Sequence, residues 1–135
     1  MDNSVKVKKY FQSEKESNKL KPLFYPESIA VIGASNKDGK LGFNIFKNLK
    51  DQGYQGKVYP INPKAKFIQG VESYSSILDV QDEIDVAIII IPAKYTPQAV
   101  KECCQKGVKF IINEAAGFSE IGKKGKQIEK RMKKT

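Results

Sequence analysis

The sequence predicts an α/β fold, in which a parallel sheet of about four to five strands is flanked by helices. Two observations point to it. The apolar run 86–91 has six residues without alternation, which is typical of a strand buried on both faces of a parallel sheet. Strand-like and helix-like segments also follow one another in the order β-α-β-(α)-β-α-β-α. With short connections and right-handed crossovers, this order predicts a doubly wound, Rossmann-like sheet.

The first strand and the first helix of the sheet are marked by apolar spacing and by glycine. Residues 29–32 are mostly β-branched and end at Gly33, which predicts a strand. A helical pattern begins near Gly42 and is expected to stop at Gly53. Its apolar positions fall on one side: Ile45, Phe46 and Leu49.

The middle of the chain predicts two further strands with an irregular connection. Residues 57–61 form the second strand, and Pro60 favours either a sheet edge or an irregular strand end because proline cannot donate to a strand ladder. Residues 64–74 are expected to form an irregular loop, and a short helix is expected to begin at Ser75. The third strand covers residues 85–91.

A helix and a fourth strand follow the apolar run. Thr96 suits the N-cap of this helix, Pro97 suits its first position, and Gly107 is expected to end it. The residues expected on its apolar face are Val100, Cys103 and Cys104. The fourth strand is expected at residues 108–112.

The two ends of the chain differ from its middle. Residues 1–21 predict a polar N-terminal extension, helical or disordered, and residues 22–135 predict one Rossmann-like domain. Leu23–Pro26 is expected to pack under the first strand. A last helix, from about Ser119 or Gly122, would normally lead into a further parallel strand, which the sequence does not show. We therefore expect the chain to be a piece of a longer multidomain protein.

The net charge of +9 lies at the two ends of the chain. Residues 1–24 carry six Lys and three acids, residues 122–135 carry seven cations and one acid, and residues 25–121 balance at eleven against eleven. A nucleic-acid-binding fold instead carries its excess as a basic stripe with interleaved aromatic residues. We therefore expect solvated charges and no nucleic-acid partner.

Composition excludes several further classes of function. The chain contains no His and no Cys-x-x-Cys spacing, so the sequence supports neither a zinc site nor a histidine base or phosphohistidine. No apolar run approaches the length of a membrane span, and the first twenty residues lack the apolar region of a signal peptide. The adjacent Cys103 and Cys104 suit reduced thiols in the cytoplasm better than a disulfide.

The turn after the first strand has the features of a phosphate-binding corner. The chain passes from a strand into a polar loop, Gly33 to Gly42, and then into a helix N-terminus. Backbone N–H groups and the positive helix end favour anionic oxygens at such a place. The loop lacks the Gly-x-Gly-x-x-Gly fingerprint that is typical of dinucleotide sites.

The end of the second strand narrows the choice of ligand. NAD sites usually place an acid there for the ribose 2′-hydroxyl, whereas this strand ends in Asn62, Pro63 and Lys64. A lysine favours an additional phosphate on the ribose, as in NADP or in coenzyme A with its 3′-phosphate. The plainer alternative for Lys64 is a solvated loop lysine.

The third and fourth strands end at the same sheet edge, where open α/β sheets bind ligands. Pro92 makes its turn rigid, and Tyr95 either stacks on a ligand or covers the sheet edge without one. Ala115 and Ala116 would let a slender ligand arm pass close to the backbone. Glu114 is expected at a buried edge, where it acts on a reacting group or caps a helix.

Five stretches of the chain together resemble one family: 26–35, 39–42, 56–64, 85–93 and 117–122. The chain resembles the N-terminal CoA-binding domain of ADP-forming acyl-CoA synthetases (acetate–CoA ligases), which are relatives of the succinyl-CoA synthetase alpha subunit. The likeness spans residues 22–130. It departs at Asn113 and Glu114, where the family usually carries small or hydroxyl residues.

This resemblance implies a coenzyme A site at the carboxyl edge of the sheet. The loop 35–37 and Gly42 would approach the phosphates, and Lys64 would meet a CoA phosphate or the adenine side. Pro92 with Ala93, and Ala115 with Ala116, would flank the ligand where it turns toward the thiol. The full expected set is Gly33, Ala34, Ser35, Asn36, Lys37, Gly42, Asn62, Pro63, Lys64, Pro92, Ala93, Tyr95, Ala115 and Ala116.

The family reaction converts acyl-CoA, phosphate and ADP into the free acid, CoA and ATP, through an acyl phosphate and a phosphohistidine. The resemblance places that histidine in a later domain and ATP in a grasp-type domain. This chain alone is therefore expected to bind CoA or acyl-CoA, with no catalytic residue of its own. Two alternatives stay open, a stand-alone CoA-binding protein and one half of an NADP-binding oxidoreductase.

Overall fold

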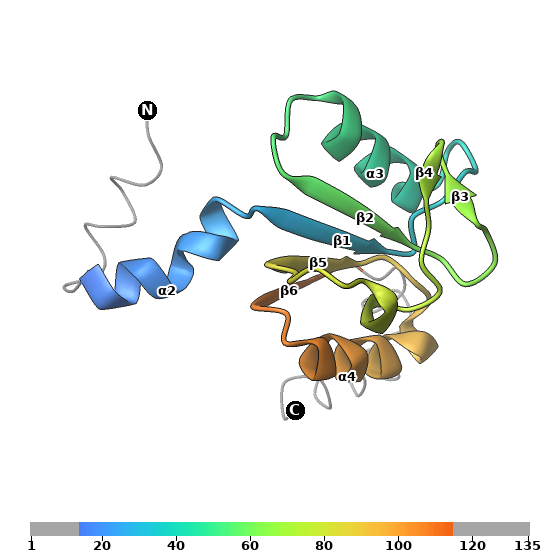
Figure 1. The fold of residues 1–135 in the computed structure, drawn as a ribbon. Helices are drawn as coiled ribbons and strands as arrows, with labels where there is room; N and C mark the ends of the chain where they lie inside the picture. The colour runs from blue at the N-terminus through green and yellow to red at the C-terminus, as the bar shows by residue number, and fades with distance from the viewer. Residues whose placement is uncertain (1–13, 115–135) are drawn as a thin grey trace.

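The structure is a computed structural model that describes residues 14–114. Within these residues, one sheet has four parallel strands in the order β2–β1–β5–β6 (Figure 1). The elements of the fold are α2 (Glu14–Phe24), β1 (Ser28–Ile32), α3 (Leu41–Asp51), β2 (Lys57–Ile61), β5 (Val86–Ile89), α4 (Thr96–Lys106) and β6 (Phe110–Asn113). The predicted Rossmann-like α/β class is confirmed, and the strand with Pro60 lies at a sheet edge.

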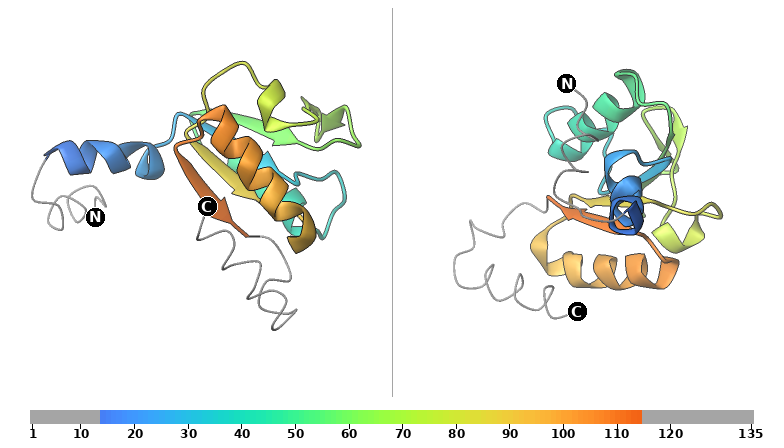
Figure 2. Two further views of the ribbon diagram at one scale, coloured as in Figure 1. Left: turned by 90° about the horizontal axis from the view of Figure 1, so that it is seen from below. Right: turned by 90° about the vertical axis from the view of Figure 1, so that its left-hand side faces the viewer.

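The sheet lies between two helical layers, with α3 on one face and α4 on the other (Figure 2). All five residues of β1 are buried, and their side chains alternate between the two faces. Ala30 and Ile32 join the core cluster that α4 covers. Ile29 and Val31 join the cluster around Phe46 of α3. Burial on both faces explains why the central strands are continuously apolar.

A small hairpin replaces the irregular loop expected at residues 64–74. Strands β3 (Phe67–Ile68) and β4 (Val71–Glu72) pair antiparallel. The two residues between them, Gln69 and Gly70, both have positive φ, 51° and 82°, which is the pattern of a type I′ hairpin turn. The turn signal was missed because the strands are only two residues long. Ile68 is fully buried and fixes the hairpin against the α3 side of the core.

Short 3₁₀ turns lie at two places where the sequence predicted the start of a helix at a different residue. The turn η1 (Ile77–Asp79) is capped by Ser76, one residue beyond the start predicted at Ser75. The Ser76 hydroxyl accepts from the Leu78 N–H, and the Asp79 carboxylate accepts from the Ser76 N–H. These reciprocal bonds are a capping box, which fixes Ser76 firmly at the entrance to the turn.

Helix α4 begins differently from the prediction. The turn η2 (Ala93–Tyr95) runs directly into it, so Thr96 has helical φ and ψ and does not cap the helix. Its buried hydroxyl has no hydrogen-bond partner within residues 14–114. Cys104 is exposed rather than part of the apolar face, and Ala99 takes that role. The buried positions 96, 99, 100 and 103 follow helical spacing.

The segment before β1 does not pack under the sheet as predicted. Helix α2 continues to Phe24 and lies beyond the amino end of β1 (Figure 1). Phe24 and Tyr25 are 44% and 50% exposed. The apolar run was misread because the helix carries these side chains past the end of the sheet.

A polar contact connects the amino ends of β1, β5 and β6. The buried Asp85 carboxylate accepts from the Glu27 N–H at 2.8 Å and pairs with the Lys109 ammonium at 3.0 Å. The Ser28 hydroxyl donates to the Glu83 carbonyl and accepts from the Asp85 N–H. Burial alone would raise the pKa of Asp85, but these hydrogen bonds and the lysine outweigh it and hold the pKa below its ordinary value.

The helix expected from Ser119 or Gly122 lies outside the described residues. Across residues 14–114, every helix is too short or too polar to cross a membrane.

The Asp85 contact predicts an acid-dependent loss of stability. Because its pKa is lower in the folded chain than the ordinary 3.8, ionised Asp85 stabilises the fold at neutral pH. This contribution to stability is lost as the pH falls below 3.8 and then through the lower pKa that Asp85 has in the folded chain. Asp85→Asn should lower the free energy of unfolding by about 1–2 kcal/mol at pH 7 and by much less near pH 3. Urea titrations at both pH values measure this, with the exposed Asp38→Asn as control. An equal loss at both values would contradict it.

Candidate functional site

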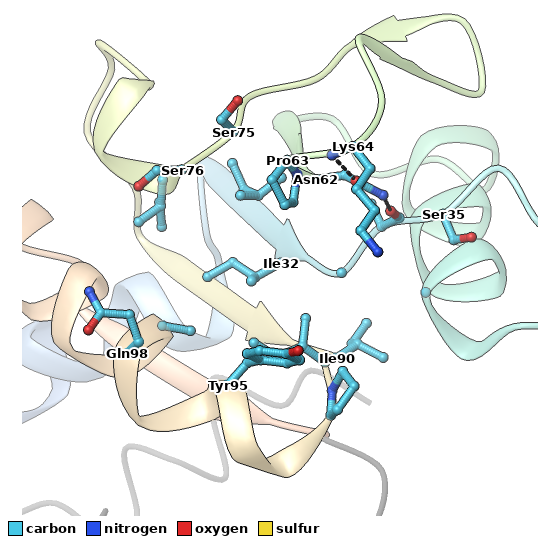
Figure 3. A pocket seen from close by; sticks show the side chains of 18 of the residues that line it. Ile32, Ser35, Asn62, Pro63, Lys64, Ser75, Ser76, Ile90, Tyr95 and Gln98 are labelled. Carbon is cyan, nitrogen blue, oxygen red and sulfur yellow. Dashed lines mark hydrogen bonds between the residues drawn. The ribbon is translucent and has the colours of Figure 1, made fainter.

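A pocket of about 970 Å³ opens at the carboxyl ends of β1, β2 and β5 (Figure 3). The first turn of α3 forms one wall, and η1 with the first turns of α4 forms the opposite wall. Its volume lies within the range of small-molecule sites. Nine of the residues predicted from the sequence line it: Gly33, Ala34, Ser35, Gly42, Asn62, Pro63, Lys64, Pro92 and Tyr95.

Two glycines let three backbone segments meet beside this pocket. Gly33 has φ of 100°, and a Cβ there would overlap the Ile90 carbonyl. A Cβ on Gly42 would overlap the Gly33 carbonyl. Glycine is therefore required at both places for β1, β5 and α3 to pack. The corner predicted as a phosphate cradle is also a packing contact.

The N-terminus of α3 is open toward the pocket. Lys40 occupies its N-cap position without a side-chain hydrogen bond to the helix, and Lys40, Leu41 and Gly42 all line the pocket. The first N–H groups of a helix have no partner inside the helix. These donors and the positive helix end form a wall of the pocket that is chemically suited to an anion.

The loop between β1 and α3 is held by its own side chains. The Ser35 hydroxyl accepts from the Lys37 N–H at 2.9 Å. The Asn36 amide donates to the Phe67 carbonyl at 2.8 Å and accepts from the Gln69 N–H at 2.7 Å. Asn36 and Lys37 do not line the pocket. The structure gives Asn36 a contact with the hairpin, and a contact of either residue with a ligand stays a prediction.

Asn62 connects the end of β2 to this loop. Its side-chain amide donates to the Ala34 carbonyl at 2.9 Å, and its oxygen accepts from the Lys64 N–H at 2.8 Å. Lys64 is exposed and has no ion pair among the residues that the structure describes. Its side chain points into the pocket from the loop after β2 (Figure 3). The Asn-Pro-Lys sequence is thus one rigid turn that presents a single cation.

The loop after β5 forms the lower rim of the pocket. Tyr95 is 55% exposed, and the Lys94 ammonium lies 5.0 Å from the centre of its ring. Ala93 is buried behind the rim and does not line the pocket. Glu114, expected at a buried edge, is exposed directly after β6, and its N–H donates to the Ile89 carbonyl. Ala115 and Ala116 lie outside the described residues.

Sequence reasoning missed the wall opposite α3. Residues of α4, the start of η1 and the two residues before it line this wall: Ser75, Ser76, Ile77, Gln98, Ala99 and Glu102. The Ser76 hydroxyl donates to one oxygen of Glu102 at 2.5 Å, and the Gln98 amide donates to the other at 3.1 Å. Positions 98 and 102 are four apart at the start of a helix after a strand, and this spacing was the available signal.

Comparisons with known proteins show which family this chain belongs to. The family model that describes a CoA binding domain matches residues 27–129. The chain belongs to the CoA-binding domain family. The earlier resemblance to the CoA-binding domain of ADP-forming acyl-CoA synthetases is thereby confirmed.

Three relatives show how this CoA-binding domain occurs in larger proteins. It is 53% identical over 113 residues to ADP-forming acetate–CoA ligase II of Archaeoglobus fulgidus, covering 84% of this chain and 17% of the ligase. It is 47% identical over 120 residues to the alpha subunit of ADP-forming acetate–CoA ligase I of Pyrococcus furiosus, covering 86% and 26%. The structure of dinucleotide forming acetyl-coenzyme A synthetase 1 of Ca. Korarchaeum cryptofilum matches with a TM-score of 0.77 and 40% identity, covering 84% and 24%. The chain thus spans about a quarter or less of the length of these proteins.

The Asn62 contacts predict a coupled loss of stability and ligand binding in this CoA-binding domain. Asn62→Ala removes two hydrogen bonds and should lower the free energy of unfolding by about 1–3 kcal/mol. Asn62→Asp keeps the acceptor for the Lys64 N–H but sets a carboxylate against the Ala34 carbonyl. Both variants should bind CoA more weakly. Calorimetry measures the CoA affinity, and a urea titration measures the free energy of unfolding. The exposed Asn44→Ala is the control, and unchanged CoA affinity in both Asn62 variants would contradict the prediction.

Proposed function

We propose that this domain binds CoA or acyl-CoA within an ADP-forming acyl-CoA synthetase and positions the thioester for reaction. One observation carries the proposal: in a chain of the CoA-binding family, Lys64 and the uncapped N-terminus of α3 face the same pocket. Their combined positive field suits a ligand with several phosphates.

The pocket fits the two charged parts of CoA. The pyrophosphate would lie against the first turn of α3 and the Gly33 turn, where backbone N–H groups are available. The 3′-phosphate would meet Lys64. The pantetheine arm would leave past Pro92 and Tyr95, which line the pocket.

The chemistry of the proposed reaction is divided between domains. CoA release from an acyl-CoA by phosphate gives an acyl phosphate, whose phosphoryl group then passes through a histidine to ADP. The 135 residues contain no histidine, so that step requires another domain or subunit, as does nucleotide binding by a grasp-type part. The CoA-binding domain supplies orientation, which is a large part of catalysis in group transfer. The free thiols Cys103 and Cys104 suit a cytoplasmic setting.

Calorimetric titration with three ligands tests the proposal. The purified chain should bind CoA more tightly than dephospho-CoA, and NADPH most weakly. Each ligand can also be tested for its thermal shift, since a bound ligand stabilises the fold. If CoA gives neither a heat of binding nor a thermal shift, the proposal is contradicted. If NADPH alone stabilises the chain against heat, the oxidoreductase alternative is favoured.

Lys64→Ala should weaken the binding of CoA more than the binding of dephospho-CoA. A charged hydrogen bond to the 3′-phosphate contributes roughly 1.5–3 kcal/mol, so the expected loss for CoA is about 10- to 150-fold. The affinity of dephospho-CoA should change little, because it lacks that phosphate. The exposed Lys66→Ala, two residues along and outside the pocket lining, is the matched control. Equal losses for both ligands would place Lys64 at the pyrophosphate or away from the ligand.

A further inference from the structure

The pocket has two polar ends of opposite character. Lys64 and Ser35 lie at one end, Ser76 and Gln98 lie at the other, and Ile32 lies between them (Figure 3). Lys40 and the N-terminus of α3 belong to the first end. The second end contains the carboxylate of Glu102.

The Glu102 carboxylate is held firmly in place. Ser76 donates to one of its oxygens at 2.5 Å and Gln98 donates to the other at 3.1 Å. Ser76 is itself fixed, because its hydroxyl accepts from Leu78 and its N–H donates to Asp79. Two different elements, η1 and α4, therefore fix the orientation of one side chain.

This end of the pocket offers acceptors. A carboxylate has about four lone-pair sites, and the two contacts above occupy two of them. One N–H of the Gln98 amide donates to Glu102, and the same amide has a second N–H and a carbonyl oxygen, so it is the Glu102 carboxylate that makes this end an acceptor. A ligand group that meets the Glu102 carboxylate must donate a hydrogen bond, and an anionic group is disfavoured there by like charge.

The charges of the pocket therefore orient a ligand that has phosphates at one end and a base at the other. The phosphates belong to the Lys64 end, and the 3′-phosphate keeps the ribose close to it. The base then extends over the apolar floor of Ile32, Ile77 and Ala99 toward Glu102. The exocyclic amine of adenine is the donor on that base.

We propose that Glu102, positioned by Ser76 and Gln98, accepts a hydrogen bond from the 6-amino group of the adenine of CoA and selects a 6-aminopurine over a 6-oxopurine. This inference rests on the proposed function. A 6-oxo group would place its carbonyl oxygen against the Glu102 carboxylate. Neither oxygen can donate, so the hydrogen bond is lost and the affinity falls.

The test compares CoA with its analogue that carries hypoxanthine in place of adenine, by calorimetry on the purified chain. The unaltered chain should bind CoA at least about tenfold more tightly than the 6-oxo analogue. Glu102→Gln should weaken CoA and narrow that preference to about threefold or less, because the carboxamide can donate to the 6-oxo group. Glu83→Gln makes the same chemical change on an exposed residue outside the pocket lining and should keep the full preference.

The outcomes separate this inference from the proposed function. CoA binding with equal affinity for both bases overturns the inference and leaves the proposed function standing. A preference that survives Glu102→Gln also overturns it. If Glu102→Gln instead abolishes discrimination against 2′-deoxy-CoA while base preference persists, the carboxylate binds the ribose and the inference fails. Absence of CoA binding by the unaltered chain overturns the proposed function and this inference with it. Should Glu102→Gln fail to fold, equal affinities of the unaltered chain for the two bases would still overturn the inference, and Gln98→Ala, which removes one of the two donors that hold Glu102, would replace it as the variant with a reduced base preference.

Discussion

The close backbone contact at Gly33 is the constraint on which the rest of the structure depends. The carbonyl of Ile90 lies where a side chain of Gly33 would be, and the carbonyl of Gly33 lies where a side chain of Gly42 would be. This contact brings the ends of two central strands against the first turn of α3. The same arrangement leaves helix N–H groups open at the sheet edge, so the close packing and the open helix end have one cause.

The polar side chains around that contact mostly serve to hold it. Asn62 joins the end of β2 to the loop after β1 through Ala34. Asn36 and Gln69 join that loop to the β3–β4 hairpin. A loop fixed on two sides loses little further conformational freedom when a ligand binds, which favours affinity. Lys64 then lies on a rigid turn and has no ion pair within residues 14–114.

Sequence patterns located the strands and the glycine turn after β1 well, because periodicity and glycine position are local properties. They failed where the neighbours of a residue decide its state. Thr96 looks like an N-cap until η2 extends the helix backward and turns it into the core. Phe24 looks like core until α2 carries it past the sheet. The hairpin was missed because its strands are too short to show alternation.

The sequence by itself determined the α/β class, the strand that is buried on both faces, the missing dinucleotide fingerprint and the lysine in place of the ribose acid. Its motifs also identified the CoA-binding family. Only the tertiary structure decided the second end of the pocket. Ser76 and Glu102 are 26 residues apart and belong to different elements, so no local pattern joins them. Their meeting depends on how α4 packs on the sheet beside η1, which is set by the buried core as a whole.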